Sequence, residues 1–367
     1  MPENTEEGAK VLMKGNEAIA EAAFRAGCGF YAGYPITPQN EITAYMARRM
    51  LSAGRVFIQA ESEVAAVNMV YGAASAGSRA MTSSSSPGVS LKQEGVSYAA
   101  GADVPFVLVN VCRGGPGLGS IAPAQSDYFQ STRGGGHGDY RCVVLAPKSV
   151  QECADLTFLA FELTAKWRVP ALLLADGLIG QMMEGVVLPP EKPFSPVLAA
   201  AKKEWAVGGG ENRAPRHITS LHLDAVELND ITKKRFARYG KIADEETRFE
   251  AIPAEGGEAD IVIAAYGSSF RSALGARLLA QKSGIRVSIF RPITLWPFPS
   301  RALSNFIDGK PVLVVEMSQG QMIEDVKLSL YDYGRNTPVH FFGCSGGLVP
   351  GEEEIFRRIK ELSLKNG

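Results

Sequence analysis

Short apolar runs rich in β-branched residues alternate with longer helix-like segments along most of this chain. In the first half, five such runs predict strands, at 55–60, 80–83, 106–112, 141–146 and 171–175. The segments of helical composition lie at 16–26, 38–50, 62–76, 89–100 and 150–166. Apolar strands separated by helices are typical of a parallel sheet with helices on both faces. The alternation therefore predicts an α/β fold.

This alternation stops between about residues 188 and 257, where prolines and glycines cluster and the charged stretch 233–250 predicts one amphipathic helix. It resumes with expected strands at 261–265, 287–290, 312–315 and 339–342, and with helices starting near Ser268, Ser300 and Gln319. At about 150 residues per domain, a length of 367 residues is typical of two domains. We predict a first domain over 1–190, a linker over 191–257 and a smaller second domain over 258–367.

Composition argues against several classes of partner and site. The chain has 38 Lys and Arg residues and 39 Asp and Glu residues, so its net charge of −1 would attract neither nucleic acid nor anionic lipid. Its apolar stretches are shorter than the roughly 20 residues needed to span a membrane. Its five cysteines form no CxxC pair, which disfavours a zinc site or an iron–sulfur cluster. Without a recognisable signal peptide, these features predict a cytoplasmic protein that binds no metal through its own residues.

Polar and glycine-rich segments follow several expected strands, where open α/β sheets place their ligands. The segment 34–40 contains Pro35, Thr37 and Pro38, and its two prolines stiffen the loop. Thr37 can either cap the following helix or donate a hydrogen bond to a ligand carboxylate. Judged from the local pattern alone, capping is the favoured interpretation.

The next two polar segments precede helices. Glu61 and Glu63 stand where a strand leads into a nearly all-apolar helix, which predicts that this helix is buried. Carboxylates in a first helical turn usually interact with the helix dipole, but Glu63 is also a candidate for partial burial, which favours a protonated carboxyl. The hydroxyl-rich turn at 82–88 includes Ser84 and Ser85, which can donate to a ligand or cap the helix.

Three further segments carry candidate residues. Arg113 precedes a glycine-rich loop that includes Gly114 and Gly115, and its fixed charge suits a carboxylate or a phosphate. This loop has neither the dinucleotide-binding spacing nor the ending of a P-loop. His137 lies in a second glycine-rich loop and is either a surface residue, the favoured interpretation, or part of a site. The segment 316–321 is interpreted as an ordinary helix entry.

The order of these motifs is more specific than any one of them. The series YPITP, ESEVAA, TSSSSPG, RGGPGLG, GGGHGDY, RPITLWPFP and EMSQGQM resembles the α subunit of the 2-oxoacid:ferredoxin oxidoreductases. The resemblance covers nearly the whole chain. It is strongest to the 2-oxoisovalerate (3-methyl-2-oxobutanoate) type, and the 2-oxoglutarate and pyruvate types are alternatives.

This resemblance implies a thiamine-diphosphate-binding fold, with a pyrimidine domain over 1–190 and a transketolase C-terminal-like domain over 258–367. Glu63 matches the family glutamate that shares a proton with N1′ of the aminopyrimidine and so favours the 4′-imino form that acts as the base. Thr37 and Arg113 match positions that contact the substrate carboxylate. Pro35, Ser84 and Ser85 are further cofactor-binding candidates, and His137, Gly114 and Gly115 are additional candidates for the site.

The resemblance also implies partners. Thiamine-diphosphate enzymes bind the diphosphate and Mg²⁺ through a GDG motif followed by an Asn, whereas this chain has only Ala175-Asp176-Gly177. The missing half of the cofactor site is therefore expected on a β subunit, and iron–sulfur clusters are expected on other chains, with γ and ferredoxin-like δ subunits completing the complex.

The implied reaction is the oxidative decarboxylation of a 2-oxoacid to acyl-CoA and CO₂, with electrons passed to ferredoxin. Two alternatives remain from the sequence. The chain could be a non-catalytic assembly subunit of the same fold. A stand-alone transketolase-like enzyme is disfavoured, because the diphosphate-binding domain is missing.

Overall fold

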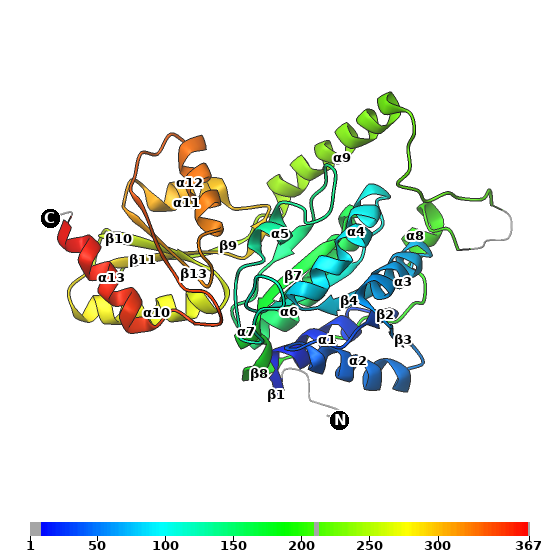
Figure 1. Cartoon of the computed structure of the whole chain (residues 1–367), viewed down its shortest axis with the longest axis horizontal. Coiled ribbons are helices and arrows are strands. Elements are labelled where there is room, and N and C mark those ends of the chain that lie inside the picture. Colours follow the sequence, from blue (N-terminus) through cyan, green and yellow to red (C-terminus); the bar gives the residue numbers. More distant parts are fainter. Residues whose placement is uncertain (1–8, 209–212, 366–367) are drawn as a thin grey trace.

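The computed structural model describes residues 9–208 and 213–365, and six of the seven strands of its largest sheet come from the first half of the chain (Figure 1). The strand order of this seven-stranded sheet is β12-β6-β7-β5-β4-β2-β3. The strands are β2 (Phe30–Gly33), β3 (Val56–Gln59), β4 (Ala80–Ser84), β5 (Val107–Cys112), β6 (Val143–Leu145), β7 (Ala171–Asp176) and β12 (Thr294–Trp296). All neighbouring pairs are parallel except β12 with β6.

Helices cover both faces of this sheet, as the alternation predicts. Buried side chains of α1 (Gly15–Arg25), α2 (Asn40–Ser52) and α6 (Val150–Trp167) form the core on one face. The other face packs against α3 (Glu63–Ser75) and α4 (Ser86–Gly101). The short helices α5 (Tyr128–Thr132) and α7 (Gly177–Gln181) and the antiparallel pair β1 (Lys10–Lys14) and β8 (Met183–Val187) complete this half. Strand β2 is not among the strands predicted from the sequence, because its apolar run is only four residues long.

The second half forms a five-stranded sheet in the order β14-β13-β10-β11-β9. Its strands are β9 (Phe249–Ile252), β10 (Ile261–Ala265), β11 (Val287–Pro292), β13 (Val312–Glu316) and β14 (Val339–Gly343). Its helices are α10 (Gly267–Lys282), α11 (Ser300–Ile307), α12 (Met322–Asp332) and α13 (Glu352–Lys365). Between the halves lie α8 (Ala199–Glu204) and the long α9 (Ala225–Glu245), which extends away from the body in Figure 1.

The division of the chain differs from the predicted boundaries at two places. Strand β9 falls within the predicted linker but pairs with β11, and Phe249 stacks on Phe290 with ring centroids 5.2 Å apart. Strand β12 falls within the predicted second domain but pairs with β6 of the first sheet. Pairing across the sheet edges, which composition does not reveal, decides both boundaries.

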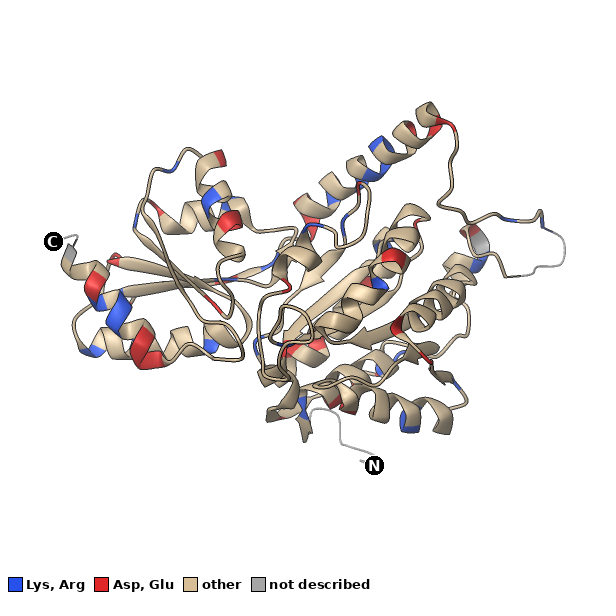
Figure 2. Ribbon diagram, viewed as in Figure 1, with Lys and Arg blue, Asp and Glu red and all other residues tan. Residues whose placement is uncertain are grey.

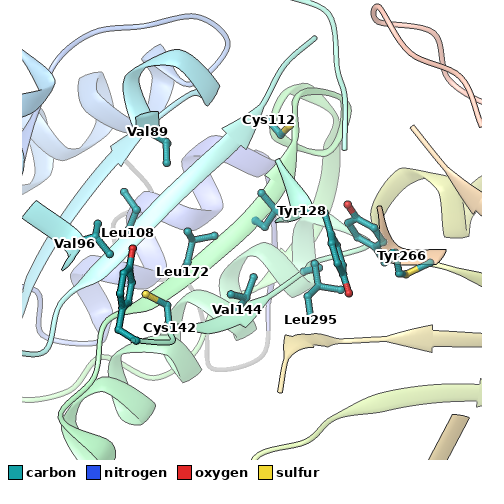
Figure 3. Close-up of a cluster of buried hydrophobic side chains, with 14 of the residues drawn as sticks. Val89, Val96, Leu108, Cys112, Tyr128, Cys142, Val144, Leu172, Tyr266 and Leu295 are labelled. Carbon is teal, nitrogen blue, oxygen red and sulfur yellow. The ribbon is translucent and has the colours of Figure 1, made fainter. Parts of the chain in front are cut away.

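The two halves share one buried core. A single cluster of buried side chains runs from the α4 face of the first sheet into the second sheet, and Tyr128 and Tyr266 meet there with ring centroids 5.9 Å apart (Figure 3). Asp176 caps α7 and also accepts a 2.6 Å hydrogen bond from Ser268 Oγ of α10. These contacts fix the second half against the edge of the first sheet where its strands end. In the described ranges, no helix is long and apolar enough to cross a bilayer.

Candidate functional site

Three of the predicted segments meet at one edge of the large sheet. Strands β2, β4 and β5 are parallel neighbours. Ser84 is the last residue of β4, and the carboxyl ends of β2 and β5 lead into the segments that carry Thr37 and Arg113. This is the edge at which open α/β sheets bind ligands. The strand order therefore brings together residues that are far apart in the sequence.

Glu63 is the first residue of α3, and its side chain turns toward the start of α4. Ser62 caps α3 by accepting a hydrogen bond from the Ala65 N–H, and Glu63 is only 6% exposed. A Cβ placed on Gly88 would overlap both the Glu63 carboxylate and Ser84 Oγ. The absence of a side chain at Gly88 therefore lets these two groups approach the β4–α4 turn.

No described residue forms a hydrogen bond or an ion pair with the Glu63 carboxylate. Glu63 is largely buried, and carboxylates in such positions without a protein partner concentrate at functional sites. In the part of the chain that is described, the Ser84 hydroxyl is fully buried and has no partner. Ser85, in contrast, donates a 2.8 Å hydrogen bond to the Val111 carbonyl. Of the two predicted serines, only Ser84 has a hydroxyl that remains free for a ligand.

Arg113 is a buried cation without a counter-ion. Its guanidinium donates hydrogen bonds to the Thr37 carbonyl at 2.9 Å and to the Leu118 carbonyl at 3.1 Å. It is 7% exposed, and the other three buried arginines all pair with carboxylates: Arg55, Arg235 and Arg291. Among the described residues, no carboxylate pairs with Arg113. A buried guanidinium of this kind suits an anionic ligand.

The capping interpretation of Thr37 is wrong. Helix α2 begins at Asn40, two residues later than predicted, and its N-cap is Gln39. Thr37 Oγ1 instead accepts a 3.3 Å hydrogen bond from Asn40 Nδ2, while the Thr37 carbonyl holds Arg113. Thr37 is therefore joined to Arg113 by a direct contact, and Pro35 is exposed in the same loop.

A network that the sequence analysis missed fixes the start of α4. Asp127 Oδ2 accepts hydrogen bonds from Ser86 Oγ at 2.6 Å and from Asn110 Nδ2 at 2.8 Å. Ser86 Oγ in turn accepts the Arg113 backbone N–H at 3.0 Å. No motif or regular spacing links these residues, so their sequence carries no signal of the network.

Gly114 and Gly115 line a cavity of about 520 Å³ between the two halves of the chain. The opposite wall comes from the second half, with Met317, Gln319 and Ser345. Glu316, next to this wall, accepts backbone N–H groups from Gln321, Met322 and Ile323 at the start of α12. This confirms the interpretation of the segment 316–321 as a helix entry.

The structure does not bring His137 to Glu63. His137 is exposed and meets the edge of Tyr98 with ring centroids 6.3 Å apart. Tyr98 follows Gly88 by ten residues on α4, a separation of about 15 Å along the helix axis. His137 instead lines a separate cavity of about 690 Å³ beneath α9. The surface interpretation of His137 agrees with this position.

Lys92 is a buried charge that the sequence analysis also missed. Its side chain is 0% exposed, and Nζ donates a 2.8 Å hydrogen bond to Thr82 Oγ1. Burial lowers the pKa of Lys92 to about 7, and the negative charge of Glu63 opposes this shift. A Lys in a helix that also has exposed faces would ordinarily be placed in solvent, so the sequence carries no signal of its burial.

Helix α3 is buried on only one side, which corrects the prediction that the whole helix is buried. Val64 and Met69 are exposed, and Gly72 has open space beside it. Beyond Glu63, α3 carries no charged residue, and its ribbon is almost wholly uncharged in Figure 2. An apolar, uncharged helix face beside the candidate site is typical of a protein–protein contact.

The described residues offer no metal centre of their own. No group of three or more His, Cys, Asp or Glu side chains is placed to hold a metal ion in the described ranges. Both carboxylate oxygens of Asp176 are already occupied by Ser268 and by the backbone N–H groups of α7. Asp176 therefore acts as a structural bridge.

Comparison with protein families and curated proteins gives consistent matches. Residues 21–231 match the thiamine-diphosphate-binding domain of the pyruvate flavodoxin/ferredoxin oxidoreductases, and residues 259–355 match core domain II of pyruvate:ferredoxin oxidoreductase. The ketoisovalerate oxidoreductase subunit VorB of Methanothermobacter marburgensis is 46% identical, over 96% of this chain and 97% of its own length. The 2-oxoglutarate synthase subunit KorA of Archaeoglobus fulgidus is 40% identical, over 86% of this chain and 90% of its own.

Solved structures agree with these matches. A 2-oxoglutarate:ferredoxin oxidoreductase from Magnetococcus marinus, with 2-oxoglutarate, coenzyme A and succinyl-CoA bound, superposes with a TM-score of 0.86 at 27% identity. The match covers 99% of this chain and 67% of that one. A split-gene transketolase superposes with a TM-score of 0.60 at 12% identity, over 97% of this chain and 99% of its own, which is a likeness of fold alone.

Proposed function

This chain belongs to the pyruvate flavodoxin/ferredoxin oxidoreductase family as the α-type subunit of a 2-oxoacid:ferredoxin oxidoreductase, and we propose that it holds both the aminopyrimidine of thiamine diphosphate and the carboxylate of the substrate. The observation that carries this proposal is the Glu63 carboxylate, which is buried against Gly88 beside the free Ser84 hydroxyl. These groups form a small polar cradle at the edge of the sheet where a ligand is expected.

The chemistry of the cradle fits the aminopyrimidine. Glu63 would hold the aminopyrimidine through a hydrogen bond between its carboxyl group and ring nitrogen N1′, and Ser84 Oγ lies beside it to accept or donate a further hydrogen bond. When bound, the cofactor supplies a nucleophilic carbon and an electron sink for decarboxylation. Ser85 and Pro35 support the fold of this edge in our proposal, because the Ser85 hydroxyl is already engaged and Pro35 stiffens the loop.

Arg113 and Thr37 form the proposed carboxylate site. Two carbonyls hold the Arg113 guanidinium in place, and its charge has no carboxylate partner among the described residues. The fork geometry of a guanidinium suits a carboxylate, and a guanidinium held in this way positions its ligand at little entropic cost. Arg113 therefore orients the 2-oxoacid, and Gly114 and Gly115 leave room beside it.

We propose 2-oxoisovalerate as the preferred 2-oxoacid. Two ketoisovalerate oxidoreductase subunits are 46% and 48% identical to this chain, whereas four 2-oxoglutarate synthase subunits are 35% to 40% identical. An apolar pocket distinguishes substrates that differ by one methylene by only about 1–3 kcal/mol, so the choice between 2-oxoisovalerate and pyruvate needs a direct kinetic comparison. The assignment is tested by comparing 2-oxoisovalerate with 2-oxoglutarate and pyruvate as alternative substrates.

A β subunit supplies the other half of the cofactor site in this proposal. The diphosphate and Mg²⁺ need ligands that Asp176 does not offer, because its oxygens are occupied. The uncharged face of α3 with Val64 and Met69 is the surface on which we place that subunit.

We assign the iron–sulfur clusters to other subunits of the complex, which also contains γ and ferredoxin-like δ subunits. Ferredoxin accepts the electrons in this proposal, and CoA accepts the acyl group. The cluster assignment follows from the cysteines of this chain, four of which are buried and none of which form a CxxC pair. We place the complex in the cytoplasm, in keeping with these free thiols.

The test compares two adjacent carboxylates in the complex of all subunits. Glu63→Gln removes the shared proton, whereas Glu61→Gln changes an exposed carboxylate two residues away. We expect Glu63→Gln to reduce CO₂ release by two or more orders of magnitude, in line with general acid–base contributions. Glu61→Gln should leave the rate near that of the wild type. Full turnover of Glu63→Gln would favour the alternative in which this chain is an assembly subunit only.

Substrate choice is measured with the same complex. Reduction of a low-potential acceptor is followed in parallel with 2-oxoisovalerate, 2-oxoglutarate and pyruvate in the presence of CoA. We expect the largest kcat/KM for 2-oxoisovalerate. A larger value for either of the other acids would contradict the assignment and leave the rest of the proposed function intact.

A further inference from the structure

The Asp127 carboxylate joins two elements that carry the proposed site. Its Oδ2 accepts hydrogen bonds from Ser86 Oγ at 2.6 Å and from Asn110 Nδ2 at 2.8 Å. Asn110 is a fully buried residue of β5, and its Oδ1 accepts the Ser86 backbone N–H at 3.1 Å. These three side chains therefore form one closed arrangement between β5 and the start of α4.

The same arrangement fixes the backbone of Arg113. The Ser86 hydroxyl donates its single proton to Asp127, and its oxygen accepts the Arg113 backbone N–H at 3.0 Å. The loop that follows Arg113 offers little packing of its own, because a Cβ on Gly115 or Gly117 would meet nothing within 4 Å. The link from Asp127 through Ser86 is therefore a main constraint on where the backbone of Arg113 lies.

The second half of the chain holds Asp127 in place. Gln321, at the end of the segment 316–321, donates from Nε2 to the Ser126 carbonyl at 2.7 Å and accepts the Phe129 N–H at 2.8 Å. These two hydrogen bonds lie on either side of Asp127 in the sequence. The position of the carboxylate therefore depends on the entry to α12, a segment to which the proposed function assigns no role.

A charged acceptor suits this task. Hydrogen bonds to a carboxylate are about twice as strong as those between neutral groups, and the 2.6 Å bond from Ser86 Oγ has the length expected of one. Asp127 also lines the cavity of about 520 Å³ together with Gly114 and Gly115. Its hydrogen bonds thus lie beside the space in which we place the 2-oxoacid, where an error of about 1 Å in a positioning group can cost two orders of magnitude in rate.

We propose that Asp127 is a positioning residue for the 2-oxoacid, which acts by fixing Arg113 through the Ser86 hydroxyl. This inference rests on the proposed role of Arg113 in binding the substrate carboxylate. Asp127 itself does not contact the acid. It fixes the backbone that carries the guanidinium, while the Thr37 and Leu118 carbonyls hold the guanidinium itself.

The first test measures KM for the 2-oxoacid with the largest kcat/KM, in the complex of all subunits. Asp127→Ala removes both hydrogen bonds, and we expect it to raise KM by roughly three- to tenfold, because the charged contact from Arg113 loses its optimal geometry. Asp127→Asn keeps an oxygen that can accept both bonds, so its KM should lie within about twofold of the wild-type value. An Asp127→Asn variant as impaired as Asp127→Ala would overturn the proposal, because the charge and not the hydrogen bonds would then matter.

A double-mutant cycle tests whether Asp127 acts through Arg113. In that case, Asp127→Ala should raise KM in the wild-type background but change it by less than about twofold in the Arg113→Gln background. Equal fold-changes in the two backgrounds would show that Asp127 acts independently of Arg113, and the proposal would be wrong.

Glu246→Ala is the matched control for a loss of stability alone. Glu246 lies at the C-terminal end of α9, is 3% exposed and accepts hydrogen bonds from Lys166, Trp167 and Arg248. We expect both alanine variants to lower the urea-unfolding midpoint of the full chain, and only Asp127→Ala to raise KM. An equal rise of KM in Glu246→Ala would reduce Asp127 to a structural residue.

These measurements separate the inference from the proposed function. An unchanged KM in Asp127→Ala, together with a raised KM in Arg113→Gln, would remove the role of Asp127 and leave the carboxylate site standing. An unchanged KM in Arg113→Gln would remove the carboxylate site itself, and the role of Asp127 with it. If Asp127→Ala does not assemble, Ser86→Ala breaks the same link to Arg113 and should also raise KM; an unchanged value there would overturn the proposal.

Discussion

Lys92→Met should stabilise the chain at low pH, and the size of the effect follows from the burial of the ammonium. Burial lowers the pKa of Lys92 from 10.5 in the unfolded chain to about 7 in the folded one. A difference of roughly 3.5 units corresponds to about 5 kcal/mol of stability that the charged lysine costs. The lost hydrogen bond to Thr82 offsets about 1 kcal/mol of the gain, which leaves a net stabilisation of about 4 kcal/mol.

The pH dependence of this gain has a definite sign. Below pH 7 both the folded and the unfolded chain carry the proton on Lys92, so the full cost is present and the variant is the more stable protein. Between about pH 7 and 10.5 the unfolded chain binds more protons at this site than the folded chain, so the wild type gains stability as the pH rises. Above pH 10.5 the difference reduces to the lost hydrogen bond, and the variant becomes slightly less stable.

The assay is urea unfolding of the full chain at several pH values, followed by tryptophan fluorescence. The difference in unfolding free energy between Lys92→Met and the wild type isolates this site, because the other titrating groups are common to both proteins. Lys241→Met removes a lysine from the exposed side of α9 and serves as the control, with a difference near zero throughout. A Lys92→Met difference that does not change between pH 6 and pH 10 would refute the reasoning.

Three further outcomes are expected. Gly88→Ala should weaken thiamine diphosphate binding, because its methyl group overlaps the Glu63 carboxylate; calorimetry on the complex measures this, and unchanged affinity would contradict the cradle. Arg113→Gln should raise KM for the 2-oxoacid roughly tenfold or more through loss of a charged hydrogen bond. Initial rates at varied 2-oxoacid concentrations measure this KM, and an unchanged value would contradict the proposed carboxylate site. Asp176→Asn should lower the unfolding free energy by about 1–3 kcal/mol, because the NH₂ group of the new amide can face the Ser268 N–H, so that two donors meet. An unchanged urea midpoint would argue against a stabilising contact between Asp176 and Ser268.

Much of the candidate site was accessible from sequence because it follows the strands. Ser84 and Arg113 each follow a predicted strand, and parallel strands end at one edge of the sheet, so their proximity could be expected before the fold was known. The role of Thr37 was not accessible, because helix α2 starts two residues later than its pattern indicates. Helix ends depend on contacts such as the Thr37 carbonyl with Arg113, which composition does not show.

Other features had no local signal. Asp127, Asn110 and Ser86 form one network although no motif joins them. His137 stands in a glycine-rich loop much like that of Arg113, yet it lies by a different cavity. The burial of Lys92 depends on helix α3 covering one face of α4, which no window of sequence around Lys92 contains.

The α/β class, the order of strands and helices along the chain and the residue types available for chemistry follow from the amino-acid sequence. They depend on local periodicity and on the order of motifs, and both can be recognised in the linear sequence. The tertiary structure alone decided which charges are buried and which carboxylates have partners. Burial and pairing arise from segments distant in sequence. Only the packed chain therefore reveals that Arg113 has no carboxylate partner among the described residues and that Lys92 is buried on α4.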